Sequence, residues 1–239
     1  MATRSLAARN DNRGERALEK LKTGDTGEAK RLFLEDLDAE QAEEKAETTR
    51  RAERRKKAAA SARNIAALAR WTDVAEAVTY YKRAVDLDPD DAQTWDDYAR
   101  AAQDAGRTDQ AKAAFEQAAL KASGEGADEI RFWAANGRGD IALAQGSLPE
   151  ALRYYRSAQE TMDRLARADP GNAGWQRDVA VSHAKLAAFY VKSGEREKAR
   201  AALGQGKAIM EAMTKLSPDN AEWKRDLAWF EGQIAALEK

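Results

Sequence analysis

The sequence predicts an all-α fold of about eleven helices, assembled from repeated helix pairs. Three observations support this prediction. Ala, Leu, Glu, Lys, Arg and Gln dominate the composition, and the 239 residues include only four prolines. Each proline lies where a helix is expected to begin or end, and one small-then-bulky pair of residues recurs along the chain.

The prolines coincide with other signals of helix boundaries. Ser147 offers an N-cap directly before Leu148 and Pro149, and proline is well tolerated in the first turn of a helix. The segment 87–91 contains Pro89 and acidic capping residues, so it is expected to end one helix and begin the next. These signals divide much of the chain into short helices joined by tight loops.

The recurring pair is a small residue followed four positions later by a bulky one. A glycine precedes the small residue by five positions in four copies, at Gly24, Gly106, Gly146 and Gly194. The pairs are Ala29 and Phe33, Ala77 and Tyr81, Ala111 and Phe115, Ala151 and Tyr155, and Ala199 and Leu203. A small side chain lets antiparallel helices approach to about 8–10 Å, and the bulky one fills the space toward the next pair.

A turn glycine, a small residue at the helix crossing and an aromatic residue one turn later resemble the signature of tetratricopeptide repeats. Trp95, Gly106, Ala111, Phe115 and Ala118 match that family's pattern most closely. The resemblance implies a right-handed α-solenoid of antiparallel helix pairs. In such a solenoid the first helix of each pair lines a concave groove that binds a protein or peptide partner.

Two longer repeats share the motif Pro-x-Asn-Ala-x-Trp-x-Arg-Asp, at Pro170–Asp178 and Pro218–Asp226. The motif and the repeat length of about 48 residues resemble a bacterial subgroup of tetratricopeptide arrays. Arrays of that subgroup are often attached to signalling or effector domains. We therefore expect the chain to be the interaction part of a larger bacterial protein or complex.

We expect a single solenoid over residues 1–239. The predicted repeats are 5–47, 48–90, 91–124, 125–169 and 170–217, followed by an unpaired final helix at 218–239. No glycine or proline lies between Glu28 and Arg70, but alignment with the later repeats puts Thr48 at the position of Pro170. This alignment predicts a turn at Glu47–Arg50. The alternative is a single helix about 60 Å long.

Composition excludes several classes of function. The 40 Lys and Arg side chains balance 41 Asp and Glu side chains, so no overall field attracts nucleic acid or an anionic membrane. The absence of cysteine and the single histidine, His183, exclude thiolate zinc sites and histidine metal clusters. Because we find no catalytic constellation, we expect neither enzyme activity nor a cofactor. No membrane span or secretory signal is recognisable, so we expect a cytoplasmic protein.

Residues 50–57 form a basic segment that follows seven acids between Glu35 and Glu47. Its bases are Arg50, Arg51, Arg54, Arg55, Lys56 and Lys57. The segment could bind phosphates in a nucleic-acid-associated module. We favour the alternative, a solvated pair of helices whose opposite charges face each other across a turn, because no aromatic residue interleaves the bases.

The repeat register predicts which residues of the first helices face the groove. They are Arg63, Arg70, Asp96, Arg100, Trp133, Asn136, Asp140, Lys185 and Lys192. The set is mixed in charge. Trp133 is either a binding anchor or a packing residue between repeats. Positions that resemble the family's chaperone-tail clamp hold residues such as Ala62 and Asp97, so chaperone carboxylates are not expected ligands.

The leading functional hypothesis is a non-catalytic protein- or peptide-binding scaffold that acts through the concave groove. Two alternatives remain. One is a nucleic-acid-associated module that acts through the basic segment. The other is self-assembly, in which the helix at 218–239 docks onto another copy of the chain. The sequence does not name the partner.

Overall fold

The computed structural model describes residues 13–238, in which every regular element is an α-helix. The ten helices of this part of the chain are α2 Arg13–Lys22, α3 Thr26–Ala69, α4 Val74–Leu87, α5 Ala92–Asp104, α6 Thr108–Lys121, α7 Ala127–Ala144, α8 Leu148–Ala168, α9 Ala173–Lys192, α10 Arg196–Leu216 and α11 Ala221–Leu237. The start of the first predicted repeat, before residue 13, lies outside the described residues. The all-helical prediction is confirmed.

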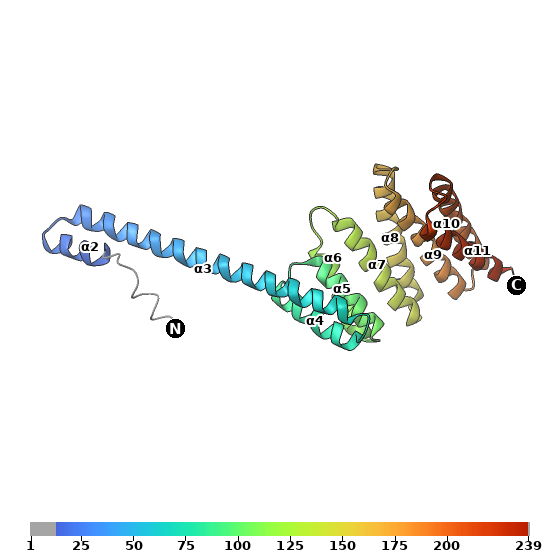
Figure 1. Cartoon of the computed structure of the whole chain (residues 1–239), viewed down its shortest axis with the longest axis horizontal. Coiled ribbons are helices and arrows are strands. Elements are labelled where there is room, and N and C mark those ends of the chain that lie inside the picture. Colours follow the sequence, from blue (N-terminus) through green and yellow to red (C-terminus); the bar gives the residue numbers. More distant parts are fainter. Residues whose placement is uncertain (1–12, 239) are drawn as a thin grey trace. The chain divides into compact units, whose positions relative to one another are not determined.

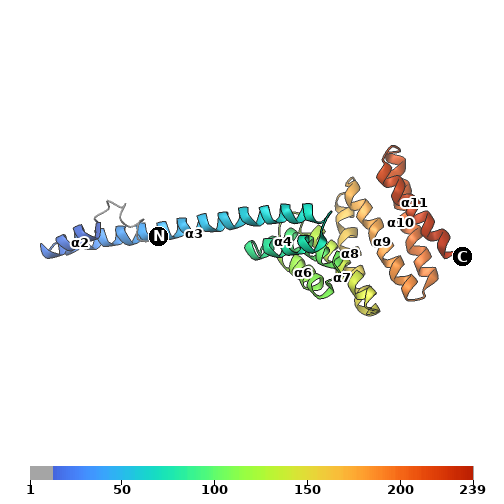
Figure 2. The same cartoon turned by 60° about the horizontal axis from the view of Figure 1, so that its bottom comes forward.

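The chain divides into two compact units at the bond between Lys57 and Ala58. The first unit contains α2 and most of α3, and the second contains the end of α3 and helices α4 to α11. In the second unit consecutive helices pack against each other as antiparallel neighbours, which forms a solenoid (Figures 1 and 2).

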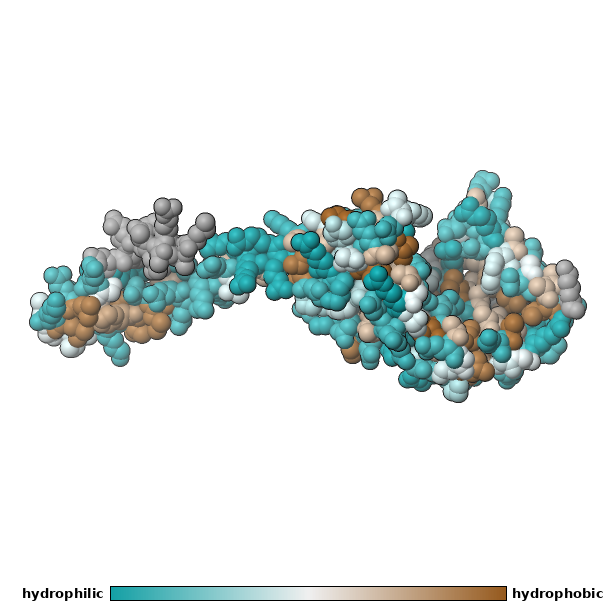
Figure 3. All heavy atoms as spheres, turned by 90° about the horizontal axis from the view of Figure 1, so that it is seen from below, coloured by the Kyte–Doolittle hydropathy of each residue, from teal (hydrophilic) through white to brown (hydrophobic). Residues whose placement is uncertain are grey.

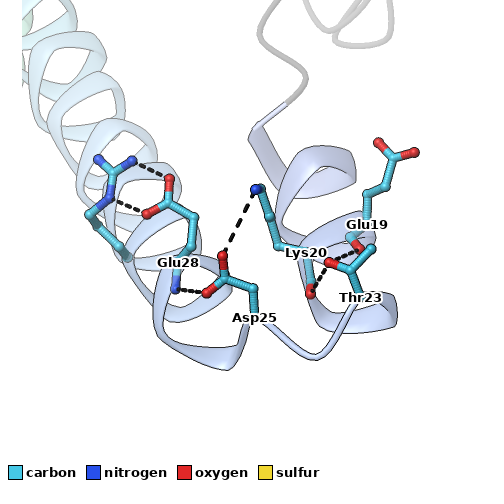
Figure 4. Close-up of polar contacts among 6 residues, drawn as sticks. Glu19, Lys20, Thr23, Asp25 and Glu28 are labelled. Carbon is cyan, nitrogen blue, oxygen red and sulfur yellow. Dashed lines mark hydrogen bonds and ion pairs between the residues drawn. The ribbon is translucent and has the colours of Figure 1, made fainter.

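A glycine turn connects α2 to α3 in the first unit. Gly24 has a φ of +82°, and the Asp25 N–H donates to the Lys20 carbonyl at 3.0 Å, as in a glycine-terminated helix. The Thr23 hydroxyl also donates to the Lys20 carbonyl, at 2.9 Å, while the Asp25 carboxylate accepts from the Glu28 N–H at 3.2 Å (Figure 4). Equivalent turns with positive φ occur at Gly106, Gly146 and Gly194.

Helix α3 is continuous over 44 residues, so the predicted turn at Glu47–Arg50 and the repeat boundary at 47/48 are wrong. The later repeats break their helices with Pro170 and an asparagine cap, Asn172. Thr48 supplies neither feature. The Thr49 hydroxyl instead donates to the Lys45 carbonyl at 2.9 Å within the helix. Because this stretch consists of helix-forming residues without glycine or proline, nothing terminates it.

The continuous helix also changes the arrangement of the charges in the first unit. The acids of residues 35–47 and the basic segment lie on successive turns of α3, and do not face each other across a turn. Side chains from 44 to 58 are all exposed, and Figure 3 shows a hydrophilic surface along the middle of this helix.

The remaining predicted repeat boundaries fall in loops of the second unit. The loops between α4 and α5, α6 and α7, α8 and α9, and α10 and α11 contain the predicted boundaries at 90/91, 124/125, 169/170 and 217/218. Within this unit the paired helices are therefore α5 with α6, α7 with α8, and α9 with α10. The end of α3 shares a buried apolar cluster with α4 through Ala66, Ala69, Ala77 and Tyr81.

The small-then-bulky pairs are buried throughout the second unit. Ala77, Ala111, Ala151 and Ala199 are each 0 % exposed, and their partners Tyr81, Phe115, Tyr155 and Leu203 are each at most 3 % exposed. In the first unit Ala29 is buried but Phe33 is 38 % exposed. There Phe33 belongs to an apolar surface patch with Leu21, Leu34 and Leu37 (Figure 3). The first copy of the pattern therefore lacks the packing of the others.

Glycines at two helix crossings leave room for aromatic rings of a neighbouring helix. A Cβ atom on Gly137 of α7 would overlap the ring of Phe115 from α6, and a Cβ on Gly206 of α10 would overlap the ring of Phe230 from α11. Gly139, which the sequence places at a packing position, similarly accommodates Tyr155 within the α7–α8 pair. These contacts set the spacing of successive helices.

We predict that spin labels at positions 40 and 57 of α3 lie far apart. In a continuous helix these positions, 17 residues apart in the sequence, are separated by about 25 Å along the axis. Double electron–electron resonance on the Glu40→Cys, Lys57→Cys variant measures the separation, because the chain has no cysteine of its own. A distance of about 10 Å, as between paired antiparallel helices, would restore the turn at Glu47–Arg50.

We predict that Gly137→Ala destabilises the chain by about 1–3 kcal/mol relative to Gly204→Ala. Both substitutions gain the same helix propensity, but only the first places a methyl group against Phe115, since no atom lies within 4 Å of a Cβ on Gly204. Urea unfolding followed by circular dichroism provides the comparison. Equal midpoints for the two variants would show that the ring does not occupy the space above Gly137.

Candidate functional site: a groove across three repeats

The first helices of three consecutive pairs line an open cavity of the second unit. Helix α5 contacts α7, and α7 contacts α9. The cavity, which we call the groove, has a volume of about 730 Å³. It is lined by Gln93, Asp96, Asp97, Arg100, Glu125, Gly126, Glu129, Ile130, Trp133, Asn172, Gly174, Trp175 and Asp178. Its volume lies in the range of about 300–1,000 Å³ that is typical of ligand sites.

Capped helix starts hold the lining residues in place. At the start of α5 the Asp91 carboxylate accepts from the Gln93 N–H at 3.1 Å, and at the start of α9 the Asn172 side chain accepts from the Trp175 N–H at 3.1 Å. Each cap satisfies a backbone N–H that the helix leaves unpaired. The Trp175 indole also donates to the Glu129 carboxylate, which connects α9 to α7 across the groove.

Asp96, Arg100 and Trp133 form a linked set of contacts in the groove. Asp96 is 3 % exposed, and its Oδ2 accepts from Arg100 Nε at 2.7 Å. The Arg100 Cζ lies 4.9 Å from the centroid of the Trp133 ring, a cation–π distance. Asp96 Oδ1 has no hydrogen-bond partner among the described residues. A buried carboxylate of the groove therefore keeps a free acceptor.

The groove is acidic, although the predicted set was mixed in charge. Five of its described lining residues are acids, namely Asp96, Asp97, Glu125, Glu129 and Asp178, and Arg100 is the one base among them. Clustered carboxylates of this kind repel one another and attract cations.

Burial makes the ionised form of three of these acids less favourable. It raises the pKa of Asp96, against the opposing effect of Arg100, and it raises the pKa of Asp97, against a hydrogen bond from Gln93. Burial also raises the pKa of Asp178 to about 6, with Arg177 opposing the shift and Glu129 adding to it. A cation that entered the groove would stabilise the ionised carboxylates.

Two predicted groove residues, Arg63 and Arg70, form ion pairs outside the groove. Arg63 Nη1 lies 3.2 Å from Asp91 Oδ2, and Arg70 Nη2 lies 2.7 Å from Asp104 Oδ2. Asp91 precedes α5 and Asp104 ends it. The two arginines therefore hold the end of α3 against both ends of α5.

Four further predicted residues lie toward the later turns of α7 and α9, and none of them lines the groove. Asn136 is 2 % exposed and neither of its amide atoms has a hydrogen-bond partner in the described part of the chain. The Asp140 carboxylate accepts from the Tyr155 hydroxyl at 2.7 Å and from Lys185 Nζ at 2.6 Å. Lys192 is exposed at the end of α9. Of the predicted set, only Asp96, Arg100 and Trp133 thus line the groove.

The predicted groove residues did not include Asp178, the sixth residue of α9. Asp178 lies seven residues before Lys185, so the same helical stripe, extended by two turns toward the N-terminus, contains it. Gly126 is likewise seven residues before Trp133, and Asp97 follows Asp96 directly. The period of the stripe was a sufficient signal for Asp178 and Gly126. The helical period alone did not show which turns of the three helices lie close together.

The basic segment, residues 50–57, is not part of the groove. All its side chains lie on α3 in the first unit and are exposed. Among residues 13–238, no cluster of His, Asp and Glu side chains could hold a metal ion. None of the helices described here combines the length and the apolar character that crossing a bilayer requires.

Comparison with known proteins finds one family match, in the first half of the second unit. Residues 72–136, from the turn before α4 into α7, match the family model described as "Tetratricopeptide repeat". This match agrees with the repeated helix pairs and with the burial of their small residues. No curated protein matches the chain in sequence.

Three solved structures resemble this chain at low similarity. The crystal structure of MamA protein has a TM-score of 0.41 and 14 % identity over 75 % of this chain and 86 % of that chain. The structure of YrrB, titled a TPR protein with an unusual peptide-binding site, has a TM-score of 0.33 and 18 % identity over 69 % of this chain and 89 % of that chain. The structure of the APC/C hetero-tetramer Cut9–Hcn1 has a TM-score of 0.28 and 20 % identity over 69 % of this chain and 35 % of that chain. Likenesses this distant do not bear on the function of this chain.

We predict that Asp178→Asn raises the melting temperature at pH 7.5, because it removes a partly buried charge. The expected rise is about 2–4 °C for each kcal/mol gained in the free energy of unfolding. The folded-state pKa of Asp178, about 6, exceeds the ordinary value of 3.8. The folded chain therefore binds the proton more tightly, and this carboxyl destabilises it increasingly as pH rises from about 4 to about 6.

The gain from Asp178→Asn should therefore shrink as the pH falls to 4.5. Scanning calorimetry at both pH values measures it, with the exposed Asp109→Asn as a control. Equal midpoints for wild type and Asp178→Asn at pH 7.5 would contradict the proposed burial of charge.

Proposed function

We propose that the chain is a non-catalytic scaffold that binds a protein or peptide segment in the groove formed by α5, α7 and α9. The observation that carries this proposal is the groove itself. It spans the first helices of three consecutive pairs and combines two tryptophans with a buried carboxylate that keeps a free acceptor. Aromatic anchors within a polar, concave surface are typical of peptide recognition.

The chemistry of the lining favours binding over catalysis. Besides two indole N–H groups, the polar side chains of its described lining are carboxylates, one guanidinium, one asparagine and one glutamine. Among these residues there is no hydroxyl, thiol, imidazole or amine that a neighbouring base could activate. The three-helix span also suits an extended ligand, because successive inner faces contact successive parts of it. We place the protein in the cytoplasm, as the interaction part of a larger bacterial protein or complex.

Self-assembly through α11 is the second candidate, favoured by a specific difference between α9 and α11. Ala180 and Ala187 of α9 are buried in a cluster with α10, whereas Ala228 and Ala235, which occupy the same repeat positions in α11, are exposed. A helix from a second copy would bury these residues. Light scattering tests this role, and a strict monomer at high concentration would contradict it.

We predict that Trp133→Ala abolishes binding of peptides selected by the wild-type chain. The protein is applied to an array of random nine-residue peptides, and the selected peptides are then measured by fluorescence anisotropy against Trp133→Ala. Trp71→Ala is the matched control, because Trp71 is 90 % exposed and does not line the groove. Truncating a central aromatic anchor typically weakens binding by about 2 kcal/mol or more, at least thirtyfold.

Two results of this experiment would overturn the proposed function. One is an array that yields no peptides at all. The other is a set of selected peptides that Trp133→Ala binds as tightly as the wild type does. Circular dichroism of each variant confirms that the helices are intact.

A further inference from the structure

The described lining of the groove has more acids than bases. The Asp97 carboxylate accepts a hydrogen bond from the neutral Gln93 side chain at 3.2 Å. Among the described residues no side chain donates a hydrogen bond to the Asp178 carboxylate, although burial raises its pKa. The neighbouring Arg177 is held by acids of α11, with Arg177 Nε 2.6 Å from Asp226 Oδ2. Among the described residues neither carboxylate therefore forms an ion pair, although Arg63, Arg100 and Arg70 act on Asp97 and Arg177 acts on Asp178 at longer range.

Asp96, although paired with Arg100, gives a second and independent indication, because one of its oxygens lacks a hydrogen-bond donor. Its side chain is 4 % exposed and lines the groove, and its Oδ1 has no hydrogen-bond partner in the described part of the chain. A buried carboxylate oxygen without a donor is costly, because it has lost its hydration. A ligand that donates a hydrogen bond to this oxygen recovers that cost on binding.

Arg100 shows how the groove already binds a basic side chain of this chain. Its guanidinium is bonded to Asp96 at 2.7 Å and lies over Trp133 at 4.9 Å from the ring centroid. The same combination, carboxylates beside an indole ring, recurs at the other side of the groove, where Asp178 and Trp175 both line it. Arginine and lysine side chains bind favourably to such surroundings, through charge-assisted hydrogen bonds and cation–π contact.

We propose that the groove selects polypeptide segments that carry arginine or lysine, and that a basic side chain of the partner binds between Asp96, Asp97 and Asp178. This proposal rests on the proposed function, and it names the chemical class of the partner. Phosphate-bearing and carboxylate-rich ligands are repelled by the same five acids.

The composition of the array peptides tests the proposal. Peptides that bind the wild type and lose binding in Trp133→Ala are sequenced, and the frequency of Arg and Lys among them is compared with the frequency in the starting array. We expect enrichment of at least threefold in Arg and Lys, and depletion of Asp and Glu.

The outcomes of the array separate the two proposals. Trp133-dependent peptides without enrichment in Arg and Lys would overturn the charge selectivity and leave the proposed function standing. If no Trp133-dependent peptides are found, both proposals fail.

Charge neutralisation within the groove provides the second test. For the tightest selected basic peptide, Asp97→Asn and Asp178→Asn should each raise Kd by about tenfold, and an increase from 50 to 300 mM NaCl should weaken wild-type binding further. Asp109→Asn removes an exposed carboxylate outside the groove and should change Kd by less than about twofold. The proposal fails if both groove variants bind the peptide as tightly as Asp109→Asn does, with circular dichroism confirming that all three are folded.

Discussion

The solenoid depends on the close approach of aromatic rings to small residues where helices cross. Phe115 of one pair occupies the space above Gly137 of the next, and Phe230 occupies the space above Gly206. A Cβ atom at either glycine would overlap the ring, so these contacts fix how far apart successive helices lie. The positions of α5, α7 and α9 follow from this spacing. The groove forms where residues of those three helices lie close together.

The sequence was sufficient for the fold wherever a local signal and a packing signal agreed. The glycines at positions 106, 146 and 194 end their helices with positive φ, and the alanines five residues later are fully buried. Helix α3 was mispredicted because the alignment placed a turn at residues 47–50, where the proline and asparagine that form the turn in a later repeat are absent. Thr48 cannot replace Pro170, since it keeps its N–H and lies in a run of strong helix formers. Local helix propensity therefore outweighed the repeat register.

The sequence predicted some residues of the candidate site correctly, but it did not predict that the site is acidic. The register identified Asp96, Arg100 and Trp133, which line the groove, but it also selected Asp140 and Lys185, which neutralise each other at 2.6 Å outside it. Ion pairs of this kind depend on the distance between neighbouring helices. That distance cannot be predicted from the residue spacing within one helix. Once Arg63, Arg70 and Lys185 are paired with acids elsewhere, an apparently mixed surface becomes an acidic groove. The net charge of the whole chain, −1, gives no indication of this separation.

The proposed basic segment binds beside Trp133 and Trp175. Nuclear magnetic resonance of the tryptophan indole N–H groups tests this binding most directly, because the six tryptophans of the chain report separately on the groove and on other surfaces. On addition of a selected peptide that contains Arg and Lys, the signals of Trp133 and Trp175 should shift while that of the exposed Trp71 stays unchanged. Shifts confined to tryptophans outside the groove, with Trp133 and Trp175 unaffected, would contradict the account.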